Sequence, residues 1–307
     1  MDYSRKISER LWNLPDKGEV ESKREQTFID DIIQKNHIEK TLLSNIDGIK
    51  TVFDAGAGSG RFSILLAKLG LKVTHFDISQ AMIDKAKELA EMAGVIDNIT
   101  FVKGNLEDLS AYREKSFDLV MSFDSPISYT YTYPNQEFVI KELVRICKKT
   151  IIISVTSRLG SLPYLANPIQ KSQFILNSNS NDNFVQWCLN NKENMINNFK
   201  YNKSICDELL ERGIVGNGEQ EIKAYIKGET PWVITYAFMP DELKNILQGC
   251  GVKNIELAGP GAYARTIPNE LLVKIMNDTK QKEDFLGFCY KYDSNIYVCG
   301  MGKDNLL

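Results

Sequence analysis

An α/β fold built on a doubly wound, mostly parallel sheet is predicted for this chain by three observations. Short apolar, β-rich runs alternate with helical stretches between residues 51 and 155. A turn rich in glycine follows the first of these runs. The alternation stops near residue 158 and resumes near residue 233. Alternation of this kind is typical of a parallel sheet with helices on both faces, and the gap indicates an insertion.

The first half of the chain supplies most of the expected sheet. An amphipathic helix is expected at 23–45, where apolar residues such as Ile32, Ile33 and Leu42 recur at helical spacing. Gly70 and Gly94 stand where helix C-caps belong, and Ser79 is placed to cap a helix N-terminus. The expected strands are 51–54, 72–76, 99–103, 117–123 and 150–155, and the helices between them are 60–69, 79–93 and 135–147.

The region from 158 to 232 breaks the alternation. A structureless loop of this length is improbable inside a compact domain, and the patterns at 183–199 and 203–212 predict helices. Strand-like runs follow at 233–238, 252–258 and 296–301, with helices at 240–249, 268–278 and 281–291. We therefore expect an N-terminal helical lid (1–48), an α/β core (49–157), an inserted helical cap that binds substrate (158–232) and a completion of the core (233–307).

Composition excludes several classes of function. The chain has 37 Lys and Arg against 40 Asp and Glu, a net charge of −3, and no dense basic block, so no nucleic acid partner is expected. Six scattered cysteines and two histidines, without a CxxC pair, predict no metal site and fit a reducing compartment. The first residues have no apolar signal region and no run is long enough to span a membrane, so we expect a cytoplasmic protein without a membrane partner. The sequence is also compatible with a homodimer.

The turn "DAGAGSGR" identifies the expected ligand site. Ligands of open α/β sheets bind outside the carboxyl ends of the strands where the strand order reverses, and glycines there expose the main chain. Gly56, Gly58 and Gly60 run G-x-G-x-G, with Arg61 where a dinucleotide fingerprint has its last glycine. Asp54 adds a carboxylate at the floor, which favours a cationic amino group and disfavours a phosphate.

In these residues the chain resembles the class I S-adenosylmethionine-dependent methyltransferases, whose first motif reads as an acid, a small residue and G-x-G-x-G. The resemblance extends over about residues 50 to 155. It implies a Rossmann-like, seven-stranded, mostly parallel sheet, here with an inserted cap. It also implies S-adenosyl-L-methionine as cofactor and S-adenosyl-L-homocysteine as product.

The resemblance assigns roles along the chain. Asp77, at the end of "KVTHFD", would accept hydrogen bonds from the ribose hydroxyls, and Ile78 and Met82 would lie against the adenosine. Asn105 and Leu106 in "GNLEDL" would meet the adenine edge, although an aspartate is commoner at 105, and "CKKT" (147–150) replaces the usual Pro-Gly-Gly turn. The expected cofactor-binding residues are Asp54, Gly56, Ala57, Gly58, Gly60, Arg61, Asp77, Ile78, Met82, Asn105, Leu106 and Phe123.

The reaction does not require a conspicuous acid–base pair. Positioning alone can lower the barrier of an in-line displacement by roughly 7 to 11 kcal/mol. His75 is favoured as a structural residue over a base, since it lies on a central strand. The better catalytic candidates follow the fourth strand in "DSPISYTYTYP": Asp124, Tyr129 and Tyr131, where tyrosines can orient a nucleophile or hold a cation. The alternative is that these tyrosines only pack a loop against the cap.

The cap is expected to select the substrate. Aromatic walls with a few arginines suit a small, flat or partly anionic ligand. The alternative is that the aromatic residues pack a hinge and the arginines are surface charges. Tyr3 and Trp12 are candidates for a mobile lid that excludes water. The expected substrate-binding residues are Tyr133, Arg158, Tyr164, Trp232, Tyr236 and Arg265.

These expectations combine into one functional hypothesis. The chain is expected to transfer a methyl group from S-adenosyl-L-methionine to an N or O atom of a small-molecule metabolite. A methyltransferase acting on tRNA or rRNA is one alternative, which the acidic composition disfavours, and "DSPI" lacks the D/N-P-P-Y/F pattern of enzymes that methylate exocyclic base nitrogens. A non-catalytic protein that binds the cofactor is the other.

Overall fold

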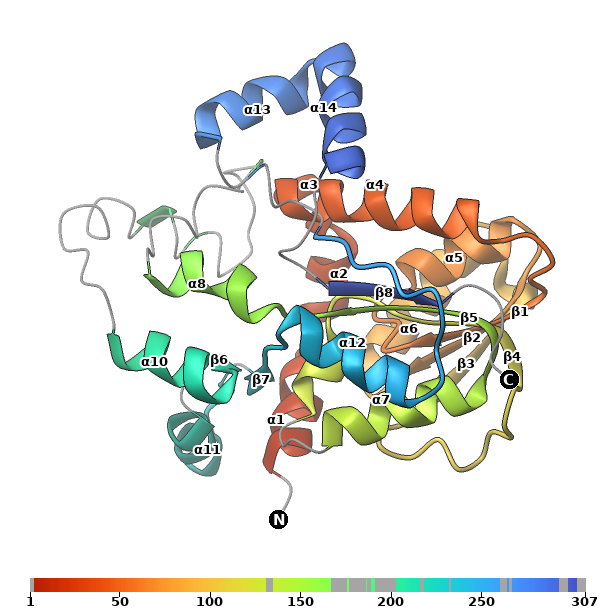
Figure 1. Cartoon of the computed structure of the whole chain (residues 1–307), viewed down its shortest axis with the longest axis horizontal. Helices are drawn as coiled ribbons and strands as arrows, with labels where there is room; N and C mark the ends of the chain where they lie inside the picture. The colour runs from red at the N-terminus through yellow and green to blue at the C-terminus, as the bar shows by residue number, and fades with distance from the viewer. Residues whose placement is uncertain are drawn as a thin grey trace.

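The computed structural model shows a central sheet with helices on both faces (Figure 1). It describes the following residues: 3–130, 135–166, 176, 186, 189–190, 203–215, 218–231, 233–259, 264, 267–292 and 298–302. The expected helix at 183–199 lies almost wholly outside this set. The sheet strands are β1 (Thr51–Ala55), β2 (Lys72–Asp77), β3 (Ile99–Lys103), β4 (Phe117–Ser122), β5 (Cys147–Val155) and β8 (Val298–Gly302).

The strand order is β3-β2-β1-β4-β5-β8, with β1 to β5 parallel and β8 antiparallel to β5. The predicted mostly parallel sheet is confirmed, but the expected seven strands are wrong: the described sheet has six, of which five are parallel. The run at 233–238 leaves the sheet and forms β7 (Thr235–Tyr236), which pairs only with β6 (Ile214–Val215) among the described strands. The run at 252–258 forms no strand among the described elements and contains one bridge residue, Glu256. Beyond β7, Phe238 forms an isolated parallel bridge to Ser157, and the next helix begins at Pro240.

Alternating apolar residues explain the two faces of the sheet. In β4, Val120 packs into one hydrophobic cluster, while Leu119 and Met121 pack into the other. Strand side chains point to opposite faces with a period of two residues, so fully apolar strands are expected where both faces are covered. Helices α4 (Ile29–Ser44), α5 (Arg61–Lys68) and α6 (Gln80–Met92) cover one face, and α7 (Asn135–Ile146) and α12 (Pro240–Gly249) cover the other (Figure 1).

Local signals set several helix boundaries. The Ser79 hydroxyl accepts a hydrogen bond from the Met82 N–H and caps α6. Gly70 and Gly94 follow α5 and α6 with φ of +84° and +69°, as expected for C-cap glycines. The helix expected at 23–45 is interrupted at Phe28, whose φ of −120° and ψ of 130° are extended. It therefore divides into α3 (Arg24–Thr27) and α4.

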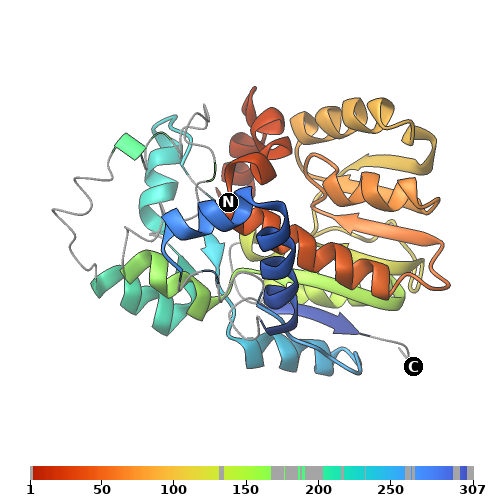
Figure 2. The same ribbon diagram turned by 90° about the horizontal axis from the view of Figure 1, so that it is seen from above.

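The remaining helices lie beside the sheet. The N-terminal helices α1 (Tyr3–Trp12) and α2 (Lys17–Ser22) stand between the sheet and the segment that was expected to form the cap, as Figure 2 shows from above. That segment contains α8 (Arg158–Ala166), α10 (Lys203–Arg212) and α11 (Gly218–Ile226). Helices α13 (Asn269–Asn277) and α14 (Thr279–Tyr292) pack on α4. Two short 3₁₀ turns, η1 (Ile96–Asn98) and η2 (Pro126–Tyr129), complete the described elements. The division into lid, core and cap stays a prediction.

Phe53 offers a direct test of the core. Its side chain is fully buried in β1, and its ring centroid lies 5.0 Å from those of Tyr112 and Phe117. We expect Phe53→Ala to lower the free energy of unfolding by about 3 to 5 kcal/mol, because a large cavity replaces the ring. Urea unfolding at equilibrium measures this change. The control Phe138→Ala removes a ring that is 50% exposed and should cost much less; equal losses would contradict the packing described.

Candidate functional site

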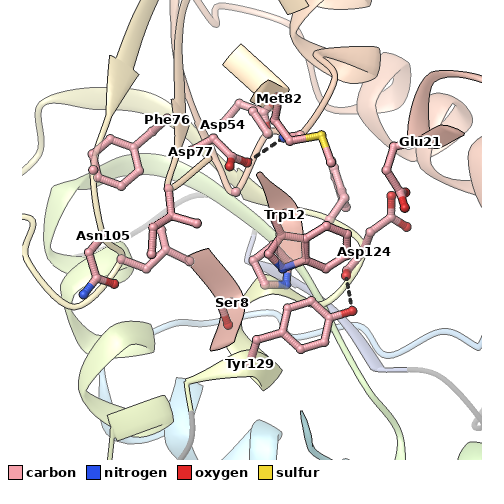
Figure 3. Close-up of a pocket in the computed structure, with 18 of the residues that line it drawn as sticks. Ser8, Trp12, Glu21, Asp54, Phe76, Asp77, Met82, Asn105, Asp124 and Tyr129 are labelled. Atoms are coloured by element: carbon pink, nitrogen blue, oxygen red, sulfur yellow. Dashed lines mark hydrogen bonds between the residues drawn. The ribbon is translucent and has the colours of Figure 1, made fainter. Parts of the chain in front are cut away.

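One cavity lies over the carboxyl ends of β1, β2 and β4, with α1, α2 and α3 forming its outer wall. It encloses about 1210 Å³, its open mouth included. Figure 3 shows Trp12 and Tyr129 next to each other in it, close to Glu21 and Asp124, with Asp77 and Asn105 farther along. The structure brings these predicted residues into its lining: Asp54, Gly56, Ala57, Gly58, Arg61, Asp77, Ile78, Met82, Asn105, Leu106, Phe123, Asp124 and Tyr129. Their roles stay predictions.

The three glycines of the turn after β1 have different structural roles. A Cβ on Gly56 would lie 2.4 Å from Pro126, so this glycine lets the turns after β1 and β4 approach each other. Gly58 has a φ of +55° and nothing within 4 Å of its Cβ position. Bare main chain is therefore presented to the cavity at Gly58. Gly60 does not line the cavity, since its Cβ position faces Ala86 on α6 at 2.9 Å.

Asp77 holds the turn at the end of β2. Its carboxylate accepts hydrogen bonds from the N–H groups of Gly58 and Ser79, both at 2.8 Å. Burial raises the pKa of Asp77, and these two hydrogen bonds oppose that rise. The side chain lines the cavity while it anchors the turn, so one carboxylate can serve the loop and a ligand.

Asp54 lies at the floor of the cavity and is only 2% exposed. Burial raises its pKa to about 7, while a hydrogen bond donated by the Ser63 hydroxyl over 2.6 Å acts in the opposite direction. The carboxylate expected from the sequence is thus largely protonated below neutral pH. A bound cation near it would favour the ionised form.

Asp124 sits in a constrained position after β4. Its φ is +61° and that of Ser125 is +66°, two consecutive left-handed residues that are not glycine. Such backbone is costly and persists where surrounding contacts hold it. Here the Asp124 carboxylate pairs with the Arg61 guanidinium at 2.5 Å and accepts a hydrogen bond from the Gln34 side chain at 2.9 Å. Arg61 and Asp124, both of them predicted site residues, thus line the cavity as an ion pair.

The outer wall carries further charged residues. Arg24 pairs with Asp31 at 2.9 Å and with Glu21 at 3.2 Å. Burial raises the pKa of Asp31 to about 6, and the Arg24 guanidinium opposes that rise. Glu25 pairs with Arg61 at 3.2 Å, which connects α3 to the start of α5.

Tyr129, at the end of η2, belongs to the same end of the cavity. Its hydroxyl donates to the Asp124 carbonyl at 3.4 Å, and its ring centroid is 5.9 Å from that of Trp12. Burial raises the pKa of Tyr129, so the hydroxyl stays protonated at physiological pH. It is therefore suited to donate a hydrogen bond and orient a group, and poorly suited to remove a proton.

Sequence reasoning missed part of this wall. Ser4, Arg5, Ser8, Glu21 and Arg24 line the cavity, yet nothing in the sequence relates them to the glycine turn. They reach it because Ser79 donates a hydrogen bond to the Trp12 carbonyl at 2.7 Å and Ser4 donates one to the Tyr129 carbonyl at 3.0 Å. The expected N-terminal lid, with Tyr3 and Trp12 as its candidate residues, was the signal that pointed to α1.

The predicted substrate residues lie elsewhere or outside the described part. Arg158 donates to the carbonyls of Ala237 and Leu210 and lies 3.5 Å from the Glu242 carboxylate, away from the cavity lining. Tyr236 is 7% exposed and donates to Glu242, which places it in the same polar cluster between α8 and α12. Tyr131, Tyr133, Trp232 and Arg265 lie outside the described residues, as does the side chain of Tyr164.

Two further findings concern metals and membranes. Among the described residues, no group of three or more His, Cys, Asp or Glu side chains is arranged to hold a metal ion. Within that same part of the chain, no helix combines the length and apolar character needed to cross a membrane.

The fold and the cavity define an α/β domain that binds a ligand across its strand ends, and comparison with known proteins specifies the domain. Residues 52–150 match the family model described as "Methyltransferase domain". The chain is 40% identical over 70 residues to tRNA 5-carboxymethoxyuridine methyltransferase of Escherichia coli (strain K12), covering 23% of this chain and 27% of that protein. It is 30% identical over 116 residues to the uncharacterized methyltransferase YbaJ of Bacillus subtilis (strain 168), covering 38% and 43% respectively.

A solved structure of a SAM-dependent methyltransferase from Methanosarcina mazei shares 16% identity, with a TM-score of 0.49 and coverage of 87% of this chain and 98% of that one. The matches span less than half the length of the two curated relatives. Residues 52–150 therefore match a methyltransferase domain. Since one relative is by name a tRNA methyltransferase, the expectation of no nucleic acid partner gains no support.

The raised pKa of the buried Asp54 carboxyl can be tested through the pH dependence of stability. Its pKa is about 7 in the folded protein against an ordinary value of 3.8, so between these values the unfolded chain binds fewer protons than the folded protein and stability falls as pH rises. Relative to Asp54→Asn, the wild type should lose free energy of unfolding on the order of 4 kcal/mol from about pH 4 to pH 7. Urea unfolding at several pH values measures this difference.

The control is Asp108→Asn. Hydrogen bonds from Ser110 lower the pKa of that exposed carboxyl, so its contribution to stability is lost only on acidification. A wild type whose stability runs parallel to that of Asp54→Asn across this pH range would contradict the raised pKa.

Proposed function

We propose that this chain is a methyltransferase that moves a methyl group from S-adenosyl-L-methionine to an N or O atom of a small molecule by in-line displacement. The observation that carries the proposal is the open main chain of Gly58 beside the Asp77 carboxylate, inside a methyltransferase domain. A nucleoside can approach bare peptide there while its sugar hydroxyls donate to a carboxylate.

The lining suggests how the donor would lie. Asp77 would hold the ribose, and the buried side chains of Met82 and Leu106 would contact the adenosine, with Asn105 at the adenine edge. The methionine end would then extend from the glycine turn toward Phe123, past the floor at Asp54. A cationic donor in this position would be close to carboxylates from β1 and β2, which stabilise positive charge.

The acceptor would occupy the end of the cavity between α1 and η2. Trp12 and Tyr129 supply aromatic surface there, and the protonated Tyr129 hydroxyl can orient an acceptor atom. Both nearby carboxylates, Asp124 and Glu21, are ion-paired with arginines. We therefore infer that these residues position the acceptor, and that the rate enhancement comes mainly from orientation and exclusion of water.

A small acceptor is favoured by the position of the N-terminal helices. Asn13 accepts a hydrogen bond from the Ala81 N–H, and Glu19 pairs with Lys85 at 2.7 Å, so the segment from α1 to α2 is attached directly over α6. A cavity bordered by these helices suits a ligand that enters it whole. The likeness to a tRNA methyltransferase favours RNA as the second candidate acceptor.

Turnover with methyl-labelled S-adenosyl-L-methionine tests the proposal. The protein is incubated with the small-molecule, RNA and protein fractions of a cell extract, and labelled product and S-adenosyl-L-homocysteine are measured together. We expect label in the small-molecule fraction, with an equal amount of S-adenosyl-L-homocysteine. Label that ribonuclease releases from the RNA fraction would contradict a small-molecule acceptor and identify RNA as the acceptor. Cofactor binding without turnover in any fraction would favour a non-catalytic binding protein.

Asp77→Ala tests the placement of the donor. Loss of the carboxylate should weaken S-adenosyl-L-homocysteine binding by about 1 to 3 kcal/mol, because charge-assisted hydrogen bonds to the sugar are lost. Isothermal titration calorimetry measures the affinity, and circular dichroism checks that the variant is folded. Asp84→Ala, on the outer surface of α6, is the matched control. Unchanged affinity in a folded Asp77→Ala variant would show that Asp77 does not bind the ribose.

A further inference from the structure

The turn after β1 is held from the side by two residues of β2. His75 and Asp77 are two positions apart in this strand, so their side chains point to the same face. The His75 Nε2 atom lies 2.9 Å from the Gly58 carbonyl oxygen, and the Asp77 carboxylate lies 2.8 Å from the Gly58 N–H. Both main-chain polar groups of one glycine are therefore bound by side chains of the neighbouring strand.

Gly58 is the residue of the turn that needs such restraint. Glycine has the widest backbone freedom of any residue, and Gly58 faces open space in the cavity. The preceding part of the turn is anchored by main-chain bonds, because the N–H groups of Gly56 and Ala57 both donate to the Phe76 carbonyl, at 2.8 and 3.1 Å. The contacts from His75 and Asp77 extend this anchoring to the point where a ligand meets the main chain.

The surroundings of His75 fit a hydrogen-bond donor. The side chain is fully buried, and its ring packs on Phe101 with centroids 5.2 Å apart. Burial lowers the pKa of His75, so the imidazole is neutral at physiological pH. Since Nε2 faces a carbonyl oxygen, the proton of the neutral ring belongs on Nε2. His75 does not line the cavity, which excludes direct contact with a ligand there.

We propose that His75 is a positioning residue for the methyl donor: its hydrogen bond to the Gly58 carbonyl fixes the glycine turn in the conformation that receives S-adenosyl-L-methionine. His75 acts through Gly58, and Asp77 combines the same anchoring with a place in the cavity lining. The inference depends on the cofactor and not on the identity of the acceptor.

Calorimetry with S-adenosyl-L-homocysteine compares four proteins. His75→Leu removes the hydrogen bond and keeps an apolar side chain, and we expect it to raise the Kd about fivefold to tenfold, the effect of roughly one hydrogen bond. His75→Gln places an amide N–H near the position of Nε2 and should recover most of the wild-type affinity. His37→Leu is the matched control, because His37 is a buried histidine on α4 that does not line the cavity. Its Kd should equal that of the wild type.

Thermal unfolding without ligand separates positioning from stability. If His75 were only a core residue, His75→Leu would lower the Tm and leave the Kd of the folded protein unchanged, which would overturn the proposal. Equal weakening by His37→Leu would overturn it as well. A wild type that does not bind S-adenosyl-L-homocysteine would instead contradict the cofactor assignment, so the two failures are distinguishable.

A measurement on the wild type covers the case in which His75→Leu does not fold. The chain has two histidines, so ¹⁵N imidazole resonances can be assigned with the His37→Leu variant. We expect the His75 ring to carry its proton on Nε2. A ring protonated on Nδ1 would leave the Gly58 carbonyl without its donor and would overturn the proposal.

Discussion

Parallel pairing of β1 with β2 on one side and β4 on the other is the constraint on which the site depends. The strand order reverses at β1, so the turn after β1 leads to one neighbour while the turn after β4 belongs to the other half of the sheet. The two turns separate and leave a crevice over the strand ends. Close approach of Gly56 to Pro126 brings the two turns together, and every predicted cofactor residue that lines the cavity lies in β1 or β2 or in a segment that follows β1, β2, β3 or β4.

The N-terminal helices cover this crevice and make it a cavity, and ion pairs help to hold these helices in place. Ion pairs connect Arg24 with Asp31, and Arg61 with both Glu25 and Asp124. Removing such groups from water costs free energy that their attraction offsets only in part, so the pairs are weak evidence for stability. Their effect on geometry is clearer, since a guanidinium bonded to two acids from different elements fixes the distance between those elements. Arg61 does this between α3 and the end of β4.

Environment, more than residue identity, decides which chemistry the cavity can perform. Asp54 is an acid whose burial keeps it largely protonated below neutral pH, and Tyr129 is a phenol whose burial keeps its proton. Asp124, which the sequence presents as a reactive carboxylate, is bound by Arg61 and Gln34 and held in a left-handed backbone conformation. These states suit a reaction whose leaving group is already activated, because orientation then matters more than proton transfer.

The sequence by itself determined the parallel strands β1 to β5, the caps at Ser79, Gly70 and Gly94, and the gathering of Asp54, Gly58 and Asp77 at one edge of the sheet. These features follow from local periodicity and from the rule that parallel strands end at the same edge. Only the tertiary structure decided that β7 leaves the main sheet, that Arg158 and Tyr236 join Glu242 away from the cavity, and that Glu21 and Arg24 enter its wall. Each of these depends on contacts between segments far apart in the chain, and no local pattern of residues encodes such contacts.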